Sequence, residues 1–110
     1  MKYLIIIAGL CLPAAVFADS DSYTISAYQW ALPRSGAALL RLAPFSAAVQ
    51  DWVAHPGARI VIVHAGSDQG SLWAGELSDW LVTLGVPSEQ IDKHVSGDQG
   101  EDSITLLVEH

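Results

Sequence analysis

Residues Arg59 to His64 form the stretch that most constrains how this chain can fold. Their sequence is RIVIVH, in which four consecutive β-branched residues stand between two polar ones. A continuous β-branched run is typical of a strand that is buried on both faces. The run therefore predicts a strand at the centre of a sheet, with the loop Ala65–Gly70 at its carboxyl end.

Two further segments have the spacing of helices that pack on a sheet. Apolar residues recur at i, i+4, i+7, i+8 and i+11 after the strand, at Trp73, Leu77, Trp80, Leu81 and Leu84. A shorter pattern before the strand places Phe45, Val49, Trp52 and Val53 on one helical face. Ser71 is expected to cap the later helix, and Gly85 and Pro87 are typical of its end. Ser35 is expected to cap the earlier helical region, which Pro44 interrupts.

Three more segments are predicted to be strands. Residues Tyr23 to Trp30 alternate in a β-branched and aromatic pattern, which places Tyr28 and Trp30 on one strand face. Ile91–Val95 and Ser103–Glu109 are the last two candidates. The resulting order, β-α-β-α-β-β, predicts an α/β two-layer sandwich with two helices packed on a mixed sheet of about four strands.

The amino terminus has the pattern of a secretory signal peptide. A charged start at Lys2 precedes the apolar run Leu4–Leu12, and small residues at Val16 and Ala18 precede a polar segment. We expect cleavage after Ala18 and a periplasmic product. The predicted organisation is a signal peptide at 1–18, a polar leader (19–22) and first strand within 19–34, and the remainder of a single α/β domain at 35–110.

The segment that precedes the cleavage site is too short to anchor the protein in a membrane. Leu4 to Ala18 spans 15 residues, whereas a transmembrane helix needs roughly 20. We therefore expect no stable membrane insertion after cleavage. The single cysteine, Cys11, belongs to the segment that is removed, so the mature chain is expected to have no disulfide.

The charge of the mature chain restricts its partners. Four basic residues oppose twelve acidic ones after removal of Lys2, which gives a net charge of −8. Such a surface repels phosphate backbones, so nucleic-acid binding is disfavoured. The expected partner is an envelope protein or a component of the cell wall.

Two segments resemble a known family. The sequence from Arg59 to Asp68 is similar to the central strand and following turn of the OmpA-like C-terminal domain, a peptidoglycan-associated module. Asp79 to Ile91 resembles the end of that family's helix and the turn after it, and the resemblance covers roughly Ser35 to Gly97. It implies a related α/β fold and a peptidoglycan-binding aspartate, for which Asp68 is the matching residue.

The chain departs from that family at the ligand site. The family pairs its aspartate with an arginine in the next helix, but the matching positions here are Leu72 and Trp73. The loop is also shortened. A carboxylate-binding site without its cation has lost its strongest charge-assisted contact, so the sequence favours the family's fold over its ligand.

The loop after the central strand carries the candidate ligand-binding residues, which are His64, Ser67, Asp68 and Gly70. Ligands of open α/β sheets favour this position at the carboxyl end of a strand. A hydrolase would use Ser67 as nucleophile and His64 as base, although the Gly-x-Ser-x-Gly spacing is absent. Tyr28 and Trp30 form a second candidate, an exposed patch for a partner.

No metal site or cofactor is predicted, because the histidines lack ligand spacing and Asp98–Asp102 lacks the alternation of a calcium loop. The leading hypothesis is a non-enzymatic binding domain of the bacterial envelope that contacts another envelope or secretion-assembly protein. Two alternatives remain, a peptidoglycan-binding module that uses Asp68 and a small hydrolase that uses His64 and Ser67.

Overall fold

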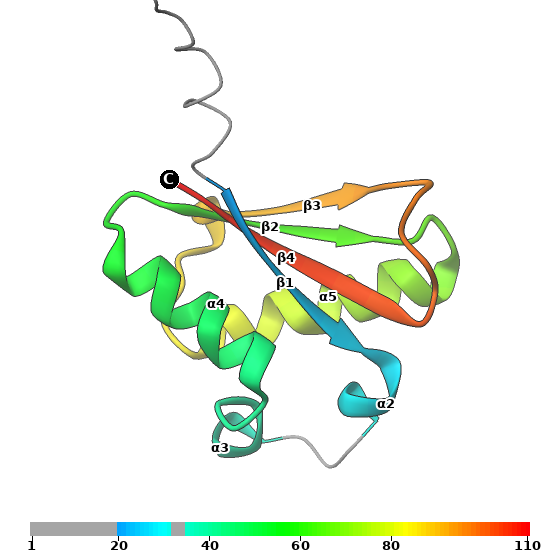
Figure 1. Ribbon diagram of the computed structural model, residues 1–110, viewed down its shortest axis with the longest axis horizontal. Coiled ribbons are helices and arrows are strands. Elements are labelled where there is room, and N and C mark those ends of the chain that lie inside the picture. Colours follow the sequence, from blue (N-terminus) through cyan, green and yellow to red (C-terminus); the bar gives the residue numbers. More distant parts are fainter. Residues whose placement is uncertain (1–19, 32–34) are drawn as a thin grey trace, which may run out of the picture.

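The computed structural model describes residues 20–31 and 35–110, so the predicted signal peptide (1–18) lies outside the described residues. The elements, shown in Figure 1, are β1 (Ser20–Ser26), α2 (Ala27–Trp30), α3 (Gly36–Leu39), α4 (Ala43–Ala54), β2 (Arg59–His64), α5 (Asp68–Thr83), a 3-10 turn (Ser88–Gln90), β3 (Ile91–Val95) and β4 (Ser103–Glu109). Within the described part of the chain, no helix has both the length and the apolar character that a bilayer crossing requires.

The four strands form one mixed sheet in the order β1-β4-β2-β3. β4 pairs antiparallel with both β1 and β2, and β2 pairs parallel with β3. The predicted α/β sandwich, with a mixed sheet of four strands, is therefore confirmed. β2 is an interior strand, as its β-branched sequence predicts, while β1 and β3 form the two edges.

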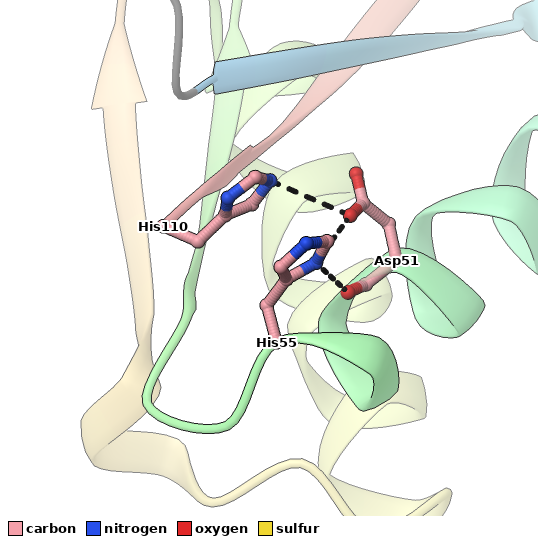
Figure 2. Close-up of side chains that lie close together, drawn as sticks. All are labelled: Asp51, His55 and His110. Carbon is pink, nitrogen blue, oxygen red and sulfur yellow. Dashed lines mark hydrogen bonds and ion pairs between the residues drawn. The ribbon is translucent and has the colours of Figure 1, made fainter. Parts of the chain in front are cut away.

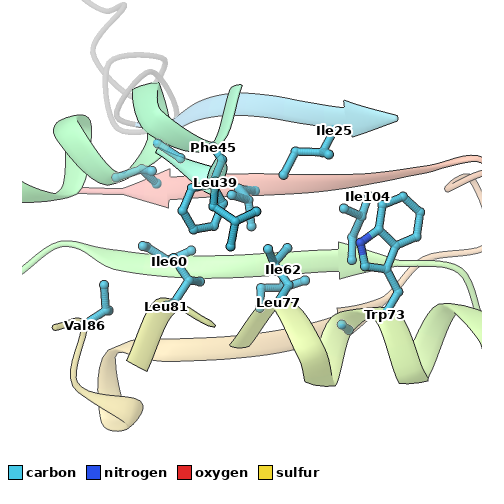
Figure 3. Packing of buried hydrophobic residues seen from close by; sticks show 14 of the residues in the cluster. Ile25, Leu39, Phe45, Ile60, Ile62, Trp73, Leu77, Leu81, Val86 and Ile104 are labelled. Atoms are coloured by element: carbon cyan, nitrogen blue, oxygen red, sulfur yellow. The ribbon is translucent and has the colours of Figure 1, made fainter. Parts of the chain in front are cut away.

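The core lies between one face of the sheet and the helices α4 and α5, as Figure 3 shows. The sheet contributes side chains that are fully buried, at Ile25, Ile60, Ile62, Ile104, Leu106 and Val108. The helices cover them with Phe45, Ala48, Trp73, Ala74, Leu77 and Leu81. The helical spacing of Trp73, Leu77 and Leu81 thus identifies the face of α5 that packs on the sheet.

The expectation that β2 is buried on both faces is wrong. Its residues alternate between half-buried and buried, with Val61 and Val63 half-buried on the face away from the core. β4 alternates in the same way. In a two-layer fold only one sheet face lies under the helices, so side chains on the other face are only partly buried.

The first strand begins and ends earlier than the alternating sequence predicts. Ser20, within the predicted polar leader, already pairs with Glu109 of β4. Ser26 ends the strand, because its side chain accepts the N–H of Gln29 and the Gln29 side chain accepts the N–H of Ser26. This capping box begins α2 at Ala27.

Tyr28 and Trp30 therefore do not share a strand face. They lie in α2, where Tyr28 is 80% exposed and Trp30 only 7% exposed. The predicted exposed Tyr28–Trp30 patch is corrected accordingly, because the two rings point into different environments. Trp30 instead packs beside Trp73, with ring centroids 6.1 Å apart.

The structure corrects one predicted helix boundary and confirms two others. α5 begins at Asp68 under a cap from Ser67, so the expected cap at Ser71 is wrong. Its predicted end is confirmed, since Gly85 has a φ of 110°, a conformation that favours glycine. The expected cap of α3 at Ser35 is confirmed, and Pro44 lies in the first turn of α4.

Leu81→Ala tests the assignment of the buried face of α5. Leu81 is fully buried, so its truncation is expected to lower the free energy of unfolding by about 2–5 kcal/mol. Val82→Ala is the matched control, because Val82 is the next residue of α5 and is 45% exposed. Urea denaturation should give the control a change below about 0.5 kcal/mol. Equal effects would mean that the face is assigned wrongly.

Candidate functional site

The loop residues predicted as a ligand site serve mainly as the start of α5. The Oγ of Ser67 accepts the N–H of Gly70 at 3.1 Å, which caps the helix. His64 is 6% exposed, and its Nδ1 lies 2.9 Å from the carbonyl oxygen of Ala65. No hydrogen bond joins His64 to Ser67 in the described part of the chain, so the geometry of a nucleophile and its base is not formed there.

Asp68 is the first residue of α5 and is exposed. A carboxylate in the first turn interacts favourably with the positive end of the helix. No ion pair reaches Asp68 among residues 20–31 and 35–110. Arg59 is paired with Asp92 at 2.8 Å, at the opposite end of β2.

Gly70 has a packing role that explains its residue type. A Cβ atom at Gly70 would lie 2.4 Å from the backbone oxygen of Ala65, closer than any real contact. The glycine lets the first turn of α5 approach the end of β2. Its predicted contribution to ligand binding stays a prediction.

A cavity of about 200 Å³ lies beside this turn, between α2 and the first half of α5. Its walls are Ala27, Trp30, Ala31, Gln69, Trp73, Glu76 and Glu101. Two indole rings and two carboxylates dominate the lining, and Glu101 comes from the loop that connects β3 to β4. Trp30, which the sequence singled out for binding, thus lies in a concave site rather than on an open patch.

The polar groups of the cavity are only partly satisfied within the protein. Trp30 Nε1 donates to Glu76 Oε1 at 3.4 Å, a long hydrogen bond. The Nε1 of Trp73 is buried and has no hydrogen-bond partner in the described residues. Among residues 20–31 and 35–110, the lining includes no basic side chain, so Glu76 and Glu101 meet no positive charge from that part of the chain.

A second cluster lies at the other end of the sheet, where α4 ends and β4 finishes. Figure 2 shows Asp51, His55 and His110 pointing toward one another. The Oδ1 of Asp51 is 2.9 Å from His55 Nδ1 and 3.5 Å from His110 Nε2. The two imidazole rings are stacked, with centroids 3.7 Å apart and planes 1° from parallel.

Tyr23 and Asp21 of β1 complete the surroundings of Asp51. The Tyr23 hydroxyl donates to Asp51 Oδ2 at 2.8 Å, and Asp21 Oδ2 lies 3.4 Å from His110 Nε2. Together with desolvation by burial and nearby negative charge, that hydrogen bond raises the pKa of Tyr23 to about 12. The phenol therefore stays protonated and donating at neutral pH.

The charge of Asp51 is set by opposing effects on its pKa. Burial disfavours the charged form, since the side chain is 7% exposed. The hydrogen bond that Tyr23 donates acts in the opposite direction, as do the nearby histidines. The balance lowers the pKa of Asp51 below its ordinary value, so this carboxylate is ionised at neutral pH.

The sequence contains one signal for this cluster, the spacing of Asp51 and His55. Asp51 lies in the predicted helix and His55 stands four residues later, where the helix is expected to stop. His55 is the C-cap of α4, so the two side chains lie close together. His110 could not be added from spacing, because it follows β4 and reaches Asp51 only in the folded chain.

Comparison of this sequence with protein-family models and with curated proteins found no match to either. The resemblance to the OmpA-like C-terminal domain therefore stays a prediction from the residues that carry it.

Two glycines of α5 allow a test of the close approach at the loop. Gly70→Ala places a methyl group against the backbone of Ala65 and is expected to destabilise the protein by about 1–3 kcal/mol. Gly75→Ala meets nothing within 4 Å and should stabilise the same helix by about 0.5–1 kcal/mol. Thermal denaturation of both variants measures the difference, and a stabilising Gly70→Ala would contradict the described packing.

Proposed function

We propose that this chain is an exported, non-enzymatic interaction domain of the bacterial envelope, and that its cavity receives a basic side chain of a partner protein. The observation that carries the proposal is the cavity between α2 and α5, with two tryptophans and two glutamates in its walls. Size, chemistry and net charge each support this assignment.

The size of the cavity favours one side chain over a larger ligand. Sites for drug-sized molecules and cofactors occupy about 300–1,000 Å³, whereas this cavity measures about 200 Å³. A lysine or arginine side chain reaching in from a partner is of the appropriate scale. The rest of such an interface would form on the surface around the opening.

The chemistry of the lining favours a positive charge. Indole rings attract cations within about 6 Å of the ring, and tryptophan does so best among the aromatic residues. Glu76 and Glu101 add two carboxylates to Trp30 and Trp73. A basic side chain can therefore place its apolar stem against the rings and its charged end beside the carboxylates.

The net negative charge of the whole chain also favours a basic partner. The full sequence carries −7 at neutral pH, so a basic partner surface is attracted over a longer range. The residues of the hydrolase alternative, by contrast, have structural uses: Ser67 caps α5 and His64 is buried.

Export is the other part of the proposal, and it rests on the amino-terminal sequence. Cleavage after Ala18 would leave all of β1 intact, because that strand begins at Ser20. The mature chain would thus keep the strand that pairs with β4. The envelope of a bacterium with a periplasm is the expected location.

A lysine analogue tests the cavity directly. Nα-acetyl-lysine amide is expected to bind with a Kd in the millimolar range, monitored by tryptophan fluorescence and by the indole N–H signals of Trp30 and Trp73. Glu76→Gln should weaken binding about tenfold, equivalent to about 1.4 kcal/mol. Glu89→Gln is the matched control, because Glu89 is exposed and lies outside the cavity lining.

The uncharged analogue with norleucine in place of lysine should bind much more weakly. Equal binding of both analogues, or equal loss in Glu76→Gln and Glu89→Gln, would contradict a cation site. Sedimentation with purified peptidoglycan sacculi addresses the main alternative. Pelleting of the wild-type protein that Asp68→Ala abolishes would support the peptidoglycan-binding module instead.

The processing site gives an independent prediction. Protein recovered from a periplasmic extract is expected to begin at Asp19, because Val16 and Ala18 provide the small residues that precede cleavage. Amino-terminal sequencing or intact mass spectrometry measures this. An intact Met1 in the membrane fraction would overturn the proposed export and cleavage.

A further inference from the structure

We propose that Asp51, His55 and His110 bind one Zn²⁺ ion at the end of the sheet where β4 finishes. One carboxylate oxygen and two imidazole nitrogens lie within 4.8 Å of one another there. The site is separate from the cavity of the proposed function, which adjoins the opposite end of β1. The two proposals can therefore fail independently.

The spacing of the donor atoms fits a shared ion. Nitrogen and oxygen ligands lie about 2.0–2.2 Å from zinc, which puts tetrahedral neighbours about 3.3–3.5 Å apart. Asp51 Oδ1 is 2.9 Å from His55 Nδ1 and 3.5 Å from His110 Nε2. Rotation of the two imidazole rings is needed to bring all three donors to bonding distance of one ion, because the rings are stacked and His55 Nδ1 also lies 2.9 Å from the backbone oxygen of Asp51.

The carboxylate is held in the orientation that such a site needs. Tyr23 donates to the Oδ2 of Asp51, while both histidines approach Oδ1. Oδ1 is therefore the atom directed at the ion, and the tyrosine is a hydrogen-bonded outer partner that fixes the ligand. Three protein ligands leave a fourth position for water.

The histidines have room to complete the coordination. Their stacked rings must turn so that the lone pairs of His55 Nδ1 and His110 Nε2 converge on one point. The side chains are 43% and 22% exposed, respectively, so solvent-facing space is available for that rotation. Asp21 lies 3.4 Å from His110 Nε2 and adds negative charge that favours a divalent cation.

The donor set selects the class of metal. Two imidazoles and one carboxylate suit zinc and copper(II), whereas magnesium and calcium prefer sites made of oxygen ligands. Zinc is the ion to test first, because it accepts a distorted tetrahedral arrangement without a geometric preference of its own.

Calorimetric titration of the untagged protein, as isolated from the producing cells and stripped with a chelator, tests the site. ZnCl₂ is expected to bind at one equivalent with a micromolar Kd, and MgCl₂ in large excess should not compete. His55→Gln and His110→Gln should each raise the Kd at least tenfold. His94→Gln is the matched control, because His94 is exposed on β3 and lies outside the cluster.

Imidazole nitrogen NMR signals identify the ligands directly. Zinc should shift the Nδ1 signal of His55 and the Nε2 signal of His110, and leave those of His64 and His94 in place. Absence of one-equivalent binding, or an equal loss of affinity in His94→Gln, would overturn the proposal. His110 lies beyond β4, so His110→Gln preserves the strand pairing and keeps the test valid if His55→Gln folds poorly.

Discussion

The pairing of β4 with both β1 and β2 is the interaction on which the rest of this structure depends. β4 follows every other element in the chain, yet it lies inside the sheet between the first two strands. Its register with β1 places Glu109 beside Ser20 and Ser103 beside Ser26. Segments from the two ends of the described chain are thereby brought together at both ends of the sheet.

Each candidate site is a consequence of that register. At one end, β1 leads into α2, and the N–H of Ala27 donates to the carbonyl of Asp102 at 2.7 Å. This contact brings the loop that carries Glu101 to the cavity lined by Trp30. At the other end of the sheet, His110 follows β4 and lies beside Asp51 of α4. Neither arrangement could be predicted from the sequence around any one of these residues.

The sequence predicted the elements whose signal is local and repeated. Each of the correct predictions rests on a signal within a single element: the β-branched run of β2, the apolar face of α5 and the glycine at the end of that helix. Prediction was wrong where two local signals competed. Alternation favoured a strand through Trp30, but the side chains of Ser26 and Gln29 satisfy the backbone of a helical turn instead.

The same competition explains the start of α5. The apolar spacing begins at Trp73, which favoured a later cap, yet Ser67 and Asp68 begin the helix one turn earlier. That turn carries little apolar surface, so periodicity could not reveal it. In the sequence alone, Gly70 is typical of a loop. Its residue type is explained only by the close approach of the helix to the backbone of Ala65 in the fold.

A nearly buried carboxylate is stable in a small fold only where it has hydrogen-bond or ion-pair partners. Asp51 meets that condition through Tyr23 of β1 and through His55, which caps the end of α4, with His110 after β4 as a third partner. The cluster thus ties α4 to the edge strand β1 and to the residue that follows β4. Loss of one partner of a buried charged group is strongly destabilising, so this polar connection contributes to the same packing that the apolar core of α4 and α5 provides. A cation bound there would act on the fold through Asp51, at the point where helix and strands meet.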